Sequence, residues 1–463
     1  MSMPTYAWPD DRNWWRAAAR AASGVSVVKR YGRVQSVVGS LVRAVVPGAR
    51  MGELCTLSDA SGGSSSFRDA RAQAAFPPCC VVGFLAESAL LMPMGDLMRV
   101  STRTRVEATG TVFTLRPDPA LCGRVLDGLG RALDDKGPLP VGAADYPVIR
   151  EAPNPMARPI DPTPFLTGLR AIDGVLTCVR GQRVGIFAAA GGGKSTLLGL
   201  IAKGARADVI VVGLIGERGR ELRDFIDNVL GPDLMARTVL VCATSDRSAM
   251  ERVTAGYVAT TIAEYFRALG KDVLLVVDSL TRFARAQRDI ALAAGEPPAR
   301  RGFPPSVFAR LPQLLERAGT DEGGGAITAF YTVLVEGDDM NEPVADEARS
   351  LLDGHIVLSS RLAAQGHYPA IDVPSSASRM MSLATSDRHQ DAARKLRAIL
   401  KRYEDLSLLI RMGEYRPGGD PKDDEAVTRQ AGVLRFLQQA QVESQGLGET
   451  IGALFDAVGD IAQ

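Results

Sequence analysis

Hydrophobic and polar positions follow three patterns along the chain, and each predicts a different domain. Between residues 28 and 102, short alternating runs are separated by glycine and proline, which favours a small β-barrel. From 103 to 380, apolar runs of strand length alternate with helical stretches, a pattern typical of a mostly parallel sheet covered by helices. From 381 to 463 the pattern is helical. The sequence therefore predicts an α/β core with an N-terminal β-barrel and a C-terminal helical domain.

The alternation gives specific expectations for the central and C-terminal regions. Strands are expected at six apolar runs: 183–188, 209–214, 238–243, 273–278, 326–335 and 355–358. Helices are expected between them and at the C-terminus, at 194–203, 217–230, 250–269, 391–403, 424–439 and 446–457. A helix and turn is expected at the entry to the central region, at 121–131.

The first 27 residues form an N-terminal extension. Trp8, Trp14 and Trp15 lie beside several arginines, and 11–22 has amphipathic helical character. One interpretation is a docking helix for a partner or a membrane surface. The other is a helix that packs on its own domain.

Composition narrows the class of protein. The formal net charge is +1, the six cysteines contain no C-x-x-C pair, and the three histidines are dispersed. We therefore expect a reducing compartment and neither a disulfide framework nor a zinc site. No apolar run is long enough to span a bilayer, and the N-terminus lacks the shape of a signal peptide, which predicts a cytoplasmic protein.

The most informative stretch is a glycine-rich loop between an apolar run and a helical start. Gly191, Gly192, Gly193, Lys194, Ser195 and Thr196 follow the expected strand at 183–188. Such a loop points its N–H groups at phosphate oxygens, its lysine at the β- and γ-phosphates and its serine hydroxyl at Mg²⁺. The pattern G-x-x-x-x-G-K-[ST] is imperfect, because alanine stands at 188 and again at 189. The alternative is a glycine-rich turn that precedes a lysine by coincidence.

Three further segments carry candidate chemistry. Asp278 ends an apolar strand and could hold the Mg²⁺ shell. Glu217 and Arg218 follow another strand, where Glu217 could polarise the attacking water and Arg218 could meet the γ-phosphate. The alternative for this pair is a charged first turn of a helix. Tyr368 could stack on adenine and Arg379 could stabilise transition-state charge, against the alternative of a Tyr-Pro turn and a surface arginine.

Four longer segments together resemble one family. They read DSLTRFARAQR at 278–288, GEPPARRGFPPSVF at 295–308, EGDDMNEPVADE at 336–347 and LDGHIVLS at 352–359. The chain, from about residue 30 to its C-terminus, resembles the export ATPases of type III secretion systems and flagella. These are relatives of the catalytic β subunit of rotary ATPases and have a RecA-like core. The segments at 340–343, 45–48 and 52–55 favour the injectisome branch over the flagellar one.

The resemblance implies roles for the matching residues around the phosphates. Lys194 and Ser195 match the loop lysine and the magnesium ligand. Asp278 matches the Walker B aspartate, whose contact with Mg²⁺ passes through water. Glu217 matches the catalytic glutamate, and Arg218 the arginine beside it.

Three more residues match by the same resemblance. Arg282 matches the arginine near the Walker B aspartate, and Tyr368 the aromatic residue that packs near adenine. Arg379 matches the arginine finger, which is donated to the nucleotide of the neighbouring subunit. A site completed in trans implies a ring whose activity depends on assembly.

The resemblance thus implies a Mg²⁺-dependent ATPase that forms a homohexamer at the cytoplasmic face of the inner membrane. Its implied partners are the stator, the central stalk, the export gate and chaperone–effector complexes. Two alternatives remain open: a nucleotide-binding ring with little turnover, and a nucleic-acid motor. Against the latter, the N-terminal region lacks a clear basic-aromatic strip, so no nucleic-acid partner is expected.

Two positions depart from the family pattern. The loop usually reads A-G-S-G-V-G-K-S, whereas this chain has Ala189, Ala190 and Gly192. Alanine at 189 costs about 1 kcal/mol of strain if that position requires a positive φ. Pro374 replaces a longer apolar residue before the finger and could change how Arg379 is aimed.

Overall fold

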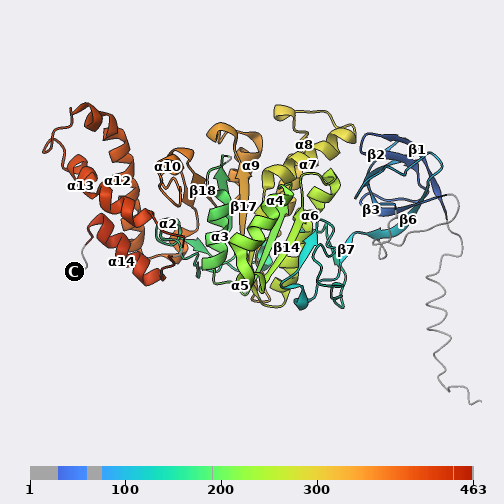
Figure 1. The fold of residues 1–463 in the computed structure, drawn as a ribbon, viewed down its shortest axis with the longest axis horizontal. Coiled ribbons are helices and arrows are strands. Elements are labelled where there is room, and N and C mark those ends of the chain that lie inside the picture. Colours follow the sequence, from blue (N-terminus) through green and yellow to red (C-terminus); the bar gives the residue numbers. More distant parts are fainter. Residues whose placement is uncertain (1–29, 60–75, 190, 442, 461–463) are drawn as a thin grey trace, which may run out of the picture. The chain divides into compact units, whose positions relative to one another are not determined.

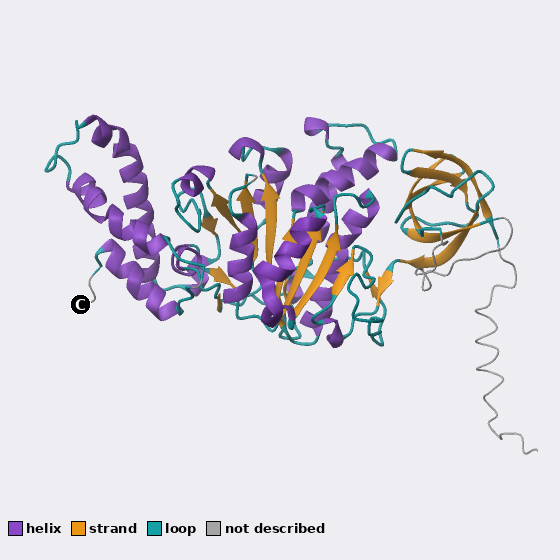
Figure 2. Cartoon of the chain, in the orientation of Figure 1, coloured by secondary structure: helices purple, strands orange, loops and turns teal. Residues whose placement is uncertain are grey.

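The computed structural model describes residues 30–59, 76–189, 191–441 and 443–460. The predicted docking helix within residues 1–27 lies outside the described residues. The described chain divides into two compact units (Figures 1 and 2), one built mainly from residues up to Thr111 and the other mainly from Val112 onward. Each unit is described by itself below.

The first unit contains a closed six-stranded barrel. Its strands are β1 (Gly32–Val38), β2 (Leu41–Val45), β3 (Glu53–Ser58), β4 (Cys79–Leu85), β5 (Ser88–Pro93) and β6 (Arg105–Val112). They pair in the order β1-β2-β5-β4-β3-β6, and β6 returns to β1 through Gly32 and Val106. Alternate residues such as Val34, Val42 and Ala44 fill the barrel interior. The predicted barrel is confirmed.

The barrel extends beyond residue 102, where the sequence pattern placed its end. Strand β6 pairs with β1 and β3 and therefore closes the sheet. Without β6 both neighbours would be edge strands with unpaired backbone groups. Its sequence, RVEATGTV, is mostly polar and outward-facing, so the apolar pattern that marks the other strands is weak there.

The second unit is built on a nine-stranded sheet, whose main path runs β19-β18-β12-β17-β15-β13-β14-β8. The strands are β8 (Val125–Asp127), β12 (Arg183–Ala188), β13 (Val209–Ile215), β14 (Thr238–Ala243), β15 (Asp272–Asp278), β16 (Gly319–Thr320), β17 (Ala326–Leu334), β18 (Gly354–Leu358) and β19 (Ala377–Ser378). All neighbours pair in parallel except β19 with β18 and β16 with β17. Two small sheets pair β7 (Thr114–Leu115) with β9 (Tyr146–Pro147) and β10 (Pro164–Phe165) with β11 (Cys178–Val179).

The prediction of a helix and turn at 121–131 is wrong, because this segment contains the strand β8. Only a short 3-10 turn, η1 (Pro119–Leu121), precedes the strand β8, which pairs with β14 through Val125 and Leu240. Gly123 and Gly130 have positive φ, a conformation that a continuous helix cannot contain. Parallel pairing with β14 also satisfies the backbone groups of β8.

Helices cover both faces of the sheet because the strands are buried on both sides. Along β13, Ile210, Val212 and Leu214 belong to one core cluster, which also contains residues of α3 and of the C-terminal helices. The residue between them, Gly213, faces α6: an added Cβ would lie 3.0 Å from the Cβ of Ala259. The alternation of period two therefore divides the sheet into a face for α3 and a face for α6.

The helices of the second unit occur mainly between strands and after the sheet. Besides η1, those between the strands and before residue 380 are η2 (Pro155–Ala157), α2 (Arg170–Val175), α3 (Lys194–Gly204), α4 (Gly219–Asp224), the π-helix η3 (Phe225–Leu230), α5 (Gly231–Met235), α6 (Ala249–Ala268), α7 (Leu280–Ala293), η4 (Arg300–Gly302), α8 (Pro305–Leu315), η5 (Glu336–Asp338), α9 (Pro343–Leu351) and α10 (Ser360–Ala364). After residue 380 come α11 (Met381–Ala384), α12 (Asp387–Met412), α13 (Pro421–Leu437) and α14 (Leu447–Val458).

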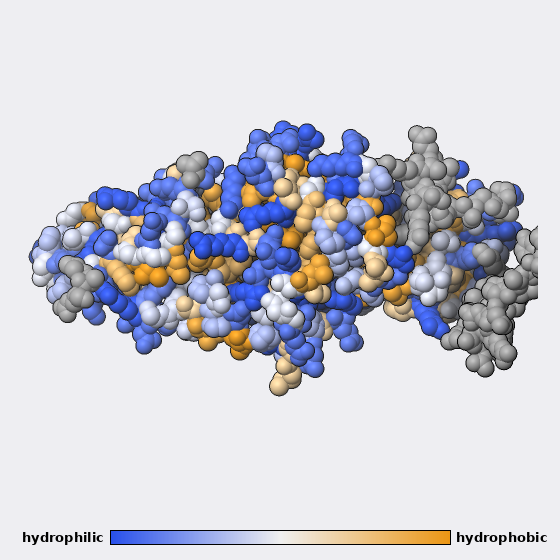
Figure 3. Space-filling view, turned by 90° about the horizontal axis from the view of Figure 1, so that it is seen from below, coloured by the Kyte–Doolittle hydropathy of each residue, from blue (hydrophilic) through white to orange (hydrophobic). Residues whose placement is uncertain are grey.

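The C-terminal helices share the core of the sheet domain. Leu396 of α12, Val433 and Phe436 of α13 and Leu454 of α14 belong to the same buried cluster as residues of α2. No described helix has the length and apolar character needed to cross a bilayer. The face drawn in Figure 3 mixes polar and apolar residues.

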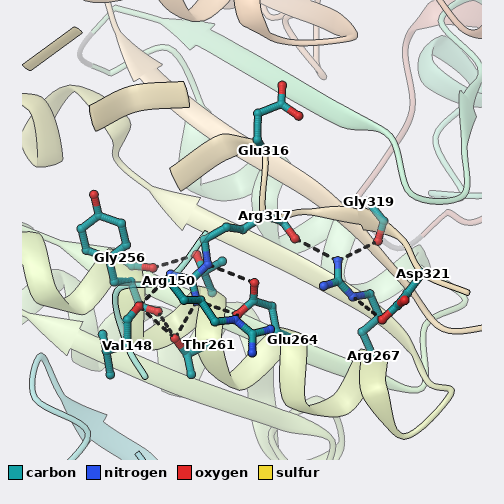
Figure 4. Close-up of polar contacts among 12 residues, drawn as sticks. Val148, Arg150, Gly256, Thr261, Glu264, Arg267, Glu316, Arg317, Gly319 and Asp321 are labelled. Carbon is teal, nitrogen blue, oxygen red and sulfur yellow. Dashed lines mark hydrogen bonds and ion pairs between the residues drawn. The ribbon is translucent and has the colours of Figure 1, made fainter. Parts of the chain in front are cut away.

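A buried ion network joins α6 to the segment after α8 (Figure 4). Arg317 donates to both oxygens of Glu264, at 3.0 and 2.5 Å, and to the carbonyl oxygen of Val148 at 2.7 Å. Both charged side chains are fully buried. Arg150 adds a second contact to Glu264, and Arg267 donates to the carbonyl oxygen of Arg317. Burial of these charges is tolerated because each has several polar partners.

We expect Arg317→Met to lower the free energy of unfolding by about 3–5 kcal/mol, because Glu264 would lose its main buried partner. Urea denaturation of the full chain measures the loss. Arg116→Met is the control, since Arg116 pairs with Asp145 at an exposed position and should change stability little. Combining Arg317→Met with Glu264→Leu should recover part of the loss; a double variant less stable than Arg317→Met would contradict the explanation.

Candidate active site

The phosphate loop connects β12 to α3, and its backbone explains its glycines. Gly191 and Gly193 have φ of 82° and 81°, a region that favours glycine. Gly192 donates its N–H to the carbonyl oxygen of Ala189 at 3.2 Å. Among the described residues, the non-glycine residues with positive φ are Ala86 and Arg301, so Ala189 is free of this strain. The alanine at 189 is therefore compatible with the loop.

Lys194 is the first residue of α3 and lies between two carboxylates. Its Nζ is 2.5 Å from Oδ1 of Asp278 and 3.4 Å from Oε1 of Glu217. All three side chains are largely buried, with exposed fractions of 12%, 5% and 9%. Strands β13 and β15 are neighbours, so their carboxyl ends bring Glu217 and Asp278 to one edge of the sheet, next to the loop.

Arg282, on the first turn of α7, fixes Glu217. Its Nη2 lies 3.2 Å from Oε2 of Glu217, and its Nη1 donates to the carbonyl oxygen of Gly216 at 2.6 Å. Gly216 has a φ of 71°, and an added Cβ there would lie 2.9 Å from Cδ of Arg282. Glycine at 216 thus allows the positive φ of the turn after β13 and leaves space for the side chain of Arg282.

The environment of Glu217 favours its protonated form. Burial raises the pKa of Glu217 to about 7, and a hydrogen bond with Glu221 adds to the rise, while the charge of Lys194 opposes it. The same hydrogen bond lowers the pKa of Glu221. A carboxylate with a pKa near neutrality can exchange a proton with water at physiological pH, as a general base requires.

Two residues near the site were not found by sequence reasoning. Thr332, on β17, donates its hydroxyl to Oδ1 of Asp278 at 2.7 Å and is buried. In the sequence, Thr332 is visible as a polar residue within the apolar run of the strand at 326–334, and this could have marked it as a candidate. The other is Glu221, whose carboxylate was visible only as one charge of a helical turn.

The donors at the loop fit Mg²⁺, which prefers oxygen ligands. Ser195 follows Lys194 on the first turn of α3. Both Ser195 and Thr196 are exposed. Asp278 supplies a carboxylate that already compensates one cation, the ammonium of Lys194. A hydroxyl, a carboxylate and phosphate oxygens form a set of hard ligands, so the predicted pair Ser195 and Asp278 is chemically suited to the ion.

Tyr368 lies beside the loop, whereas Arg218 points into solvent. An added Cβ at Gly193 would lie 4.0 Å from Cε1 of Tyr368, whose exposed fraction is 51%. Arg218 precedes α4, its side chain is 80% exposed, and it lies 4.0 Å from Glu221. Tyr368 thus borders the same loop as Lys194, and Arg218 contacts neither Lys194 nor Asp278.

Arg379 is not brought to the phosphate loop of its own chain. It follows β19, donates its N–H to the carbonyl oxygen of Asp353 at 3.0 Å, and Asp353 donates in turn to Arg183 at 2.9 Å. Arg183 begins β12, whereas the loop follows the other end of this six-residue strand. That strand alone spans about 17 Å. Arg379 is exposed, with Nη2 3.2 Å from the carbonyl oxygen of Arg349, so it is accessible to another molecule.

Comparisons with known proteins show to which family the chain belongs. Residues 168–378 match the nucleotide-binding domain of the ATP synthase alpha/beta family, and residues 385–456 match the T3SS EscN ATPase C-terminal domain. The type 3 secretion system ATPase of Xanthomonas euvesicatoria is 49% identical over 95% of this chain and 97% of that protein. The flagellum-specific ATP synthase of Bacillus subtilis is 46% identical over 93% of this chain and 96% of its own length.

Solved structures give the same result. The assembled ATPase EscN from the type III secretion system of enteropathogenic E. coli matches 92% of this chain and 100% of its own, with a TM-score of 0.85 and 43% identity. EscN in complex with its central stalk EscO matches with a TM-score of 0.82 and 42% identity, over 92% of this chain and 100% of that one. The predicted RecA-like architecture with a barrel and a helical C-terminal domain is confirmed. By identity and coverage, this chain belongs to the type 3 secretion system ATPases.

Proposed function

We propose that this type III secretion ATPase hydrolyses ATP at the cluster of Lys194, Glu217 and Asp278, in a ring that completes each site with Arg379 of an adjacent copy. The observation that carries the proposal is the contact of one buried ammonium with two buried carboxylates directly after a phosphate loop. Phosphoryl transfer requires positioned charges around the γ-phosphate and a carboxylate for the water, and this cluster supplies both.

Each residue has a distinct part in the proposed reaction. Lys194 compensates negative charge on the β- and γ-phosphates, and backbone N–H groups of the loop bind their oxygens. Glu217 orients the attacking water and takes its proton, while Arg282 holds the carboxylate in place at 3.2 Å. Ser195 and, through water, Asp278 would hold Mg²⁺, which would neutralise charge on the phosphates. Tyr368 packs on the adenine, and Arg218 approaches the γ-phosphate from solvent.

The ring is the second part of the proposal. Arg379 is exposed and separated from its own phosphate loop by the length of β12, so its contact with a phosphate needs a second copy. We infer a homohexamer at the cytoplasmic face of the inner membrane, with a central stalk like that of EscN, a stator, the export gate and chaperone–effector complexes as partners. ATP hydrolysis there would release chaperones and unfold substrates before export.

A phosphate-release assay tests this proposal. The specific activity of the full chain should rise with protein concentration as rings form, because each site needs its neighbour. Chelating Mg²⁺ with EDTA should abolish release, and adding Mg²⁺ back should restore it. Lys194→Ala is the control without turnover. Equal specific activity at concentrations below and above assembly would exclude a shared site.

The pH dependence of kcat/KM tests the role of Glu217. Because its pKa is raised to about 7, kcat/KM for ATP should rise with pH through this value, as the ionised base forms. Glu221→Gln removes a neighbour that favours protonated Glu217, so the rising limb should move to lower pH. Asp227→Asn, further along the same helical segment, is the control and should leave the limb in place. An unmoved limb in Glu221→Gln would contradict the assignment of the base.

A further inference from the structure

We propose that Gln439 is a positioning residue that holds Tyr368 beside the phosphate loop, so that the C-terminal helices govern how tightly the nucleotide base is bound. Gln439 lies in the connection between α13 and α14 and does not line the phosphate loop itself. The inference rests on the proposed function, because it takes Tyr368 as the residue that packs on the base.

The side chain of Gln439 is a buried amide that makes three hydrogen bonds to backbone groups. Its exposed fraction is 5%. Oε1 accepts from the N–H of Arg170 at 2.9 Å, and Nε2 donates to the carbonyl oxygens of Gly168 at 2.7 Å and Glu443 at 3.0 Å. A buried amide with three such bonds fixes its own main chain, because loss of any of them leaves an unpaired polar group.

The segment before α2 that Gln439 contacts is itself held by hydrogen bonds. Asp173 accepts from the N–H groups of Thr167 and Gly168, at 2.9 and 2.8 Å, and from the hydroxyl of Thr167 at 2.7 Å. Arg170 returns a bond from Nε to the carbonyl oxygen of Phe436 at 2.8 Å. The start of α2 and the end of α13 are therefore bonded in both directions.

The main chain of Gln439 makes the contact that reaches the nucleotide site. Its N–H donates to the carbonyl oxygen of Tyr368 at 3.0 Å. The ring of Tyr368 is half exposed and borders Gly193, so about half of its surface is left without contacts inside the chain. On its N-terminal side, His367 bonds to Leu362 of α10. The bond from Gln439 thus ties Tyr368 to the C-terminal domain.

These contacts form a continuous path within the second unit. The sheet domain holds the amide of Gln439, the amide fixes the peptide of residue 439, and that peptide holds the carbonyl of Tyr368. Removing the amide should leave the described part of the phosphate loop and its lysine untouched, since Gln439 makes no hydrogen bond to those residues. The expected loss is therefore confined to binding of the base and spares binding of the phosphates.

Binding of Mg·ADP and Mg·pyrophosphate to the full chain separates these two contributions, because only ADP has a base. Gln439→Ala should raise the Kd for ADP about tenfold, as expected for lost hydrogen bonds, and leave that for pyrophosphate unchanged. Gln439→Met, which keeps the side-chain volume but cannot make these bonds, should do the same. Gln438→Ala is the matched control, because the side chain of Gln438 is exposed and makes none of the hydrogen bonds that Gln439 makes.

A double-mutant cycle with Tyr368→Ala completes the test. In the Tyr368→Ala background, Gln439→Ala should cause no further loss of ADP affinity. Equal weakening of ADP and pyrophosphate, or full additivity with Tyr368→Ala, would overturn the inference. If Tyr368→Ala alone leaves ADP binding unchanged, the proposed role of Tyr368 fails; if only Gln439→Ala is silent, the positioning role alone fails.

Discussion

Replacing Glu217 with glutamine is expected to lower kcat for ATP hydrolysis about 10³-fold while ATP binding persists. Glutamine has nearly the same shape and can still accept from Arg282, but it cannot take a proton from water. Lys194 and the loop remain, so the phosphates keep their partners. The measurements are single-turnover hydrolysis and equilibrium binding of Mg·ATP.

The control for Glu217→Gln is Glu221→Gln, which removes the neighbouring carboxylate on α4 without removing the proposed base. It should retain most of the hydrolytic rate at pH 8, above the limb set by Glu217. Normal turnover in Glu217→Gln would refute the base assignment, and lost binding would mean that the carboxylate has a structural part in the loop.

The second large effect is expected from Arg379→Ala. Loss of an arginine finger lowers kcat by about 10³-fold or more, because charge on the γ-phosphate is no longer compensated in the transition state. Among the described residues, Arg379 donates hydrogen bonds to the carbonyl oxygens of Asp353 and Arg349 and to no side chain, so ring assembly and folding should persist. Phosphate release and sedimentation measure these two properties. Arg361→Ala, an exposed arginine paired with Glu404, is the control and should be nearly silent.

Mixing two inactive proteins tests whether sites are shared. Arg379→Ala keeps Lys194, and Lys194→Ala keeps Arg379, so a mixed ring contains some interfaces with both residues intact. Phosphate release should therefore reappear in the mixture in proportion to these interfaces. A mixture that assembles into mixed rings and stays inactive would place the function of Arg379 within its own chain.

Much of the sheet could be predicted from the sequence. The strands at 183–188 and 238–243 agree with β12 and β14 to the residue, because a strand buried on both faces is a continuous apolar run. The misses have physical reasons. Most residues of strand β6 are polar and face out of the barrel. Strand β8 has only three residues, too few to show a periodic pattern. Pairing partners far along the chain fix both strands.

The residues of the candidate site likewise include some that the sequence reveals and others that it does not. Lys194, Glu217, Asp278 and Arg282 meet because each stands at a loop or at the end of a strand, which sequence patterns reveal. Thr332 and Glu221 could not be assigned, since their importance comes from neighbours on other segments. The proposed partner of Arg379 belongs to a second copy, so no pattern within one chain can reveal it. Its role as a finger stays a prediction that the mixing experiment addresses.

The backbone of the phosphate loop has a consequence for how such ATPases are recognised in genomes. Positive φ occurs at Gly191 and Gly193 but not at Ala189. A search motif that demands glycine at 188 or 189 would pass over this chain, although nothing in its geometry requires glycine there. A motif written as G-x-G-K-S, followed by a helix, states the steric requirement and would retain divergent members with small residues upstream.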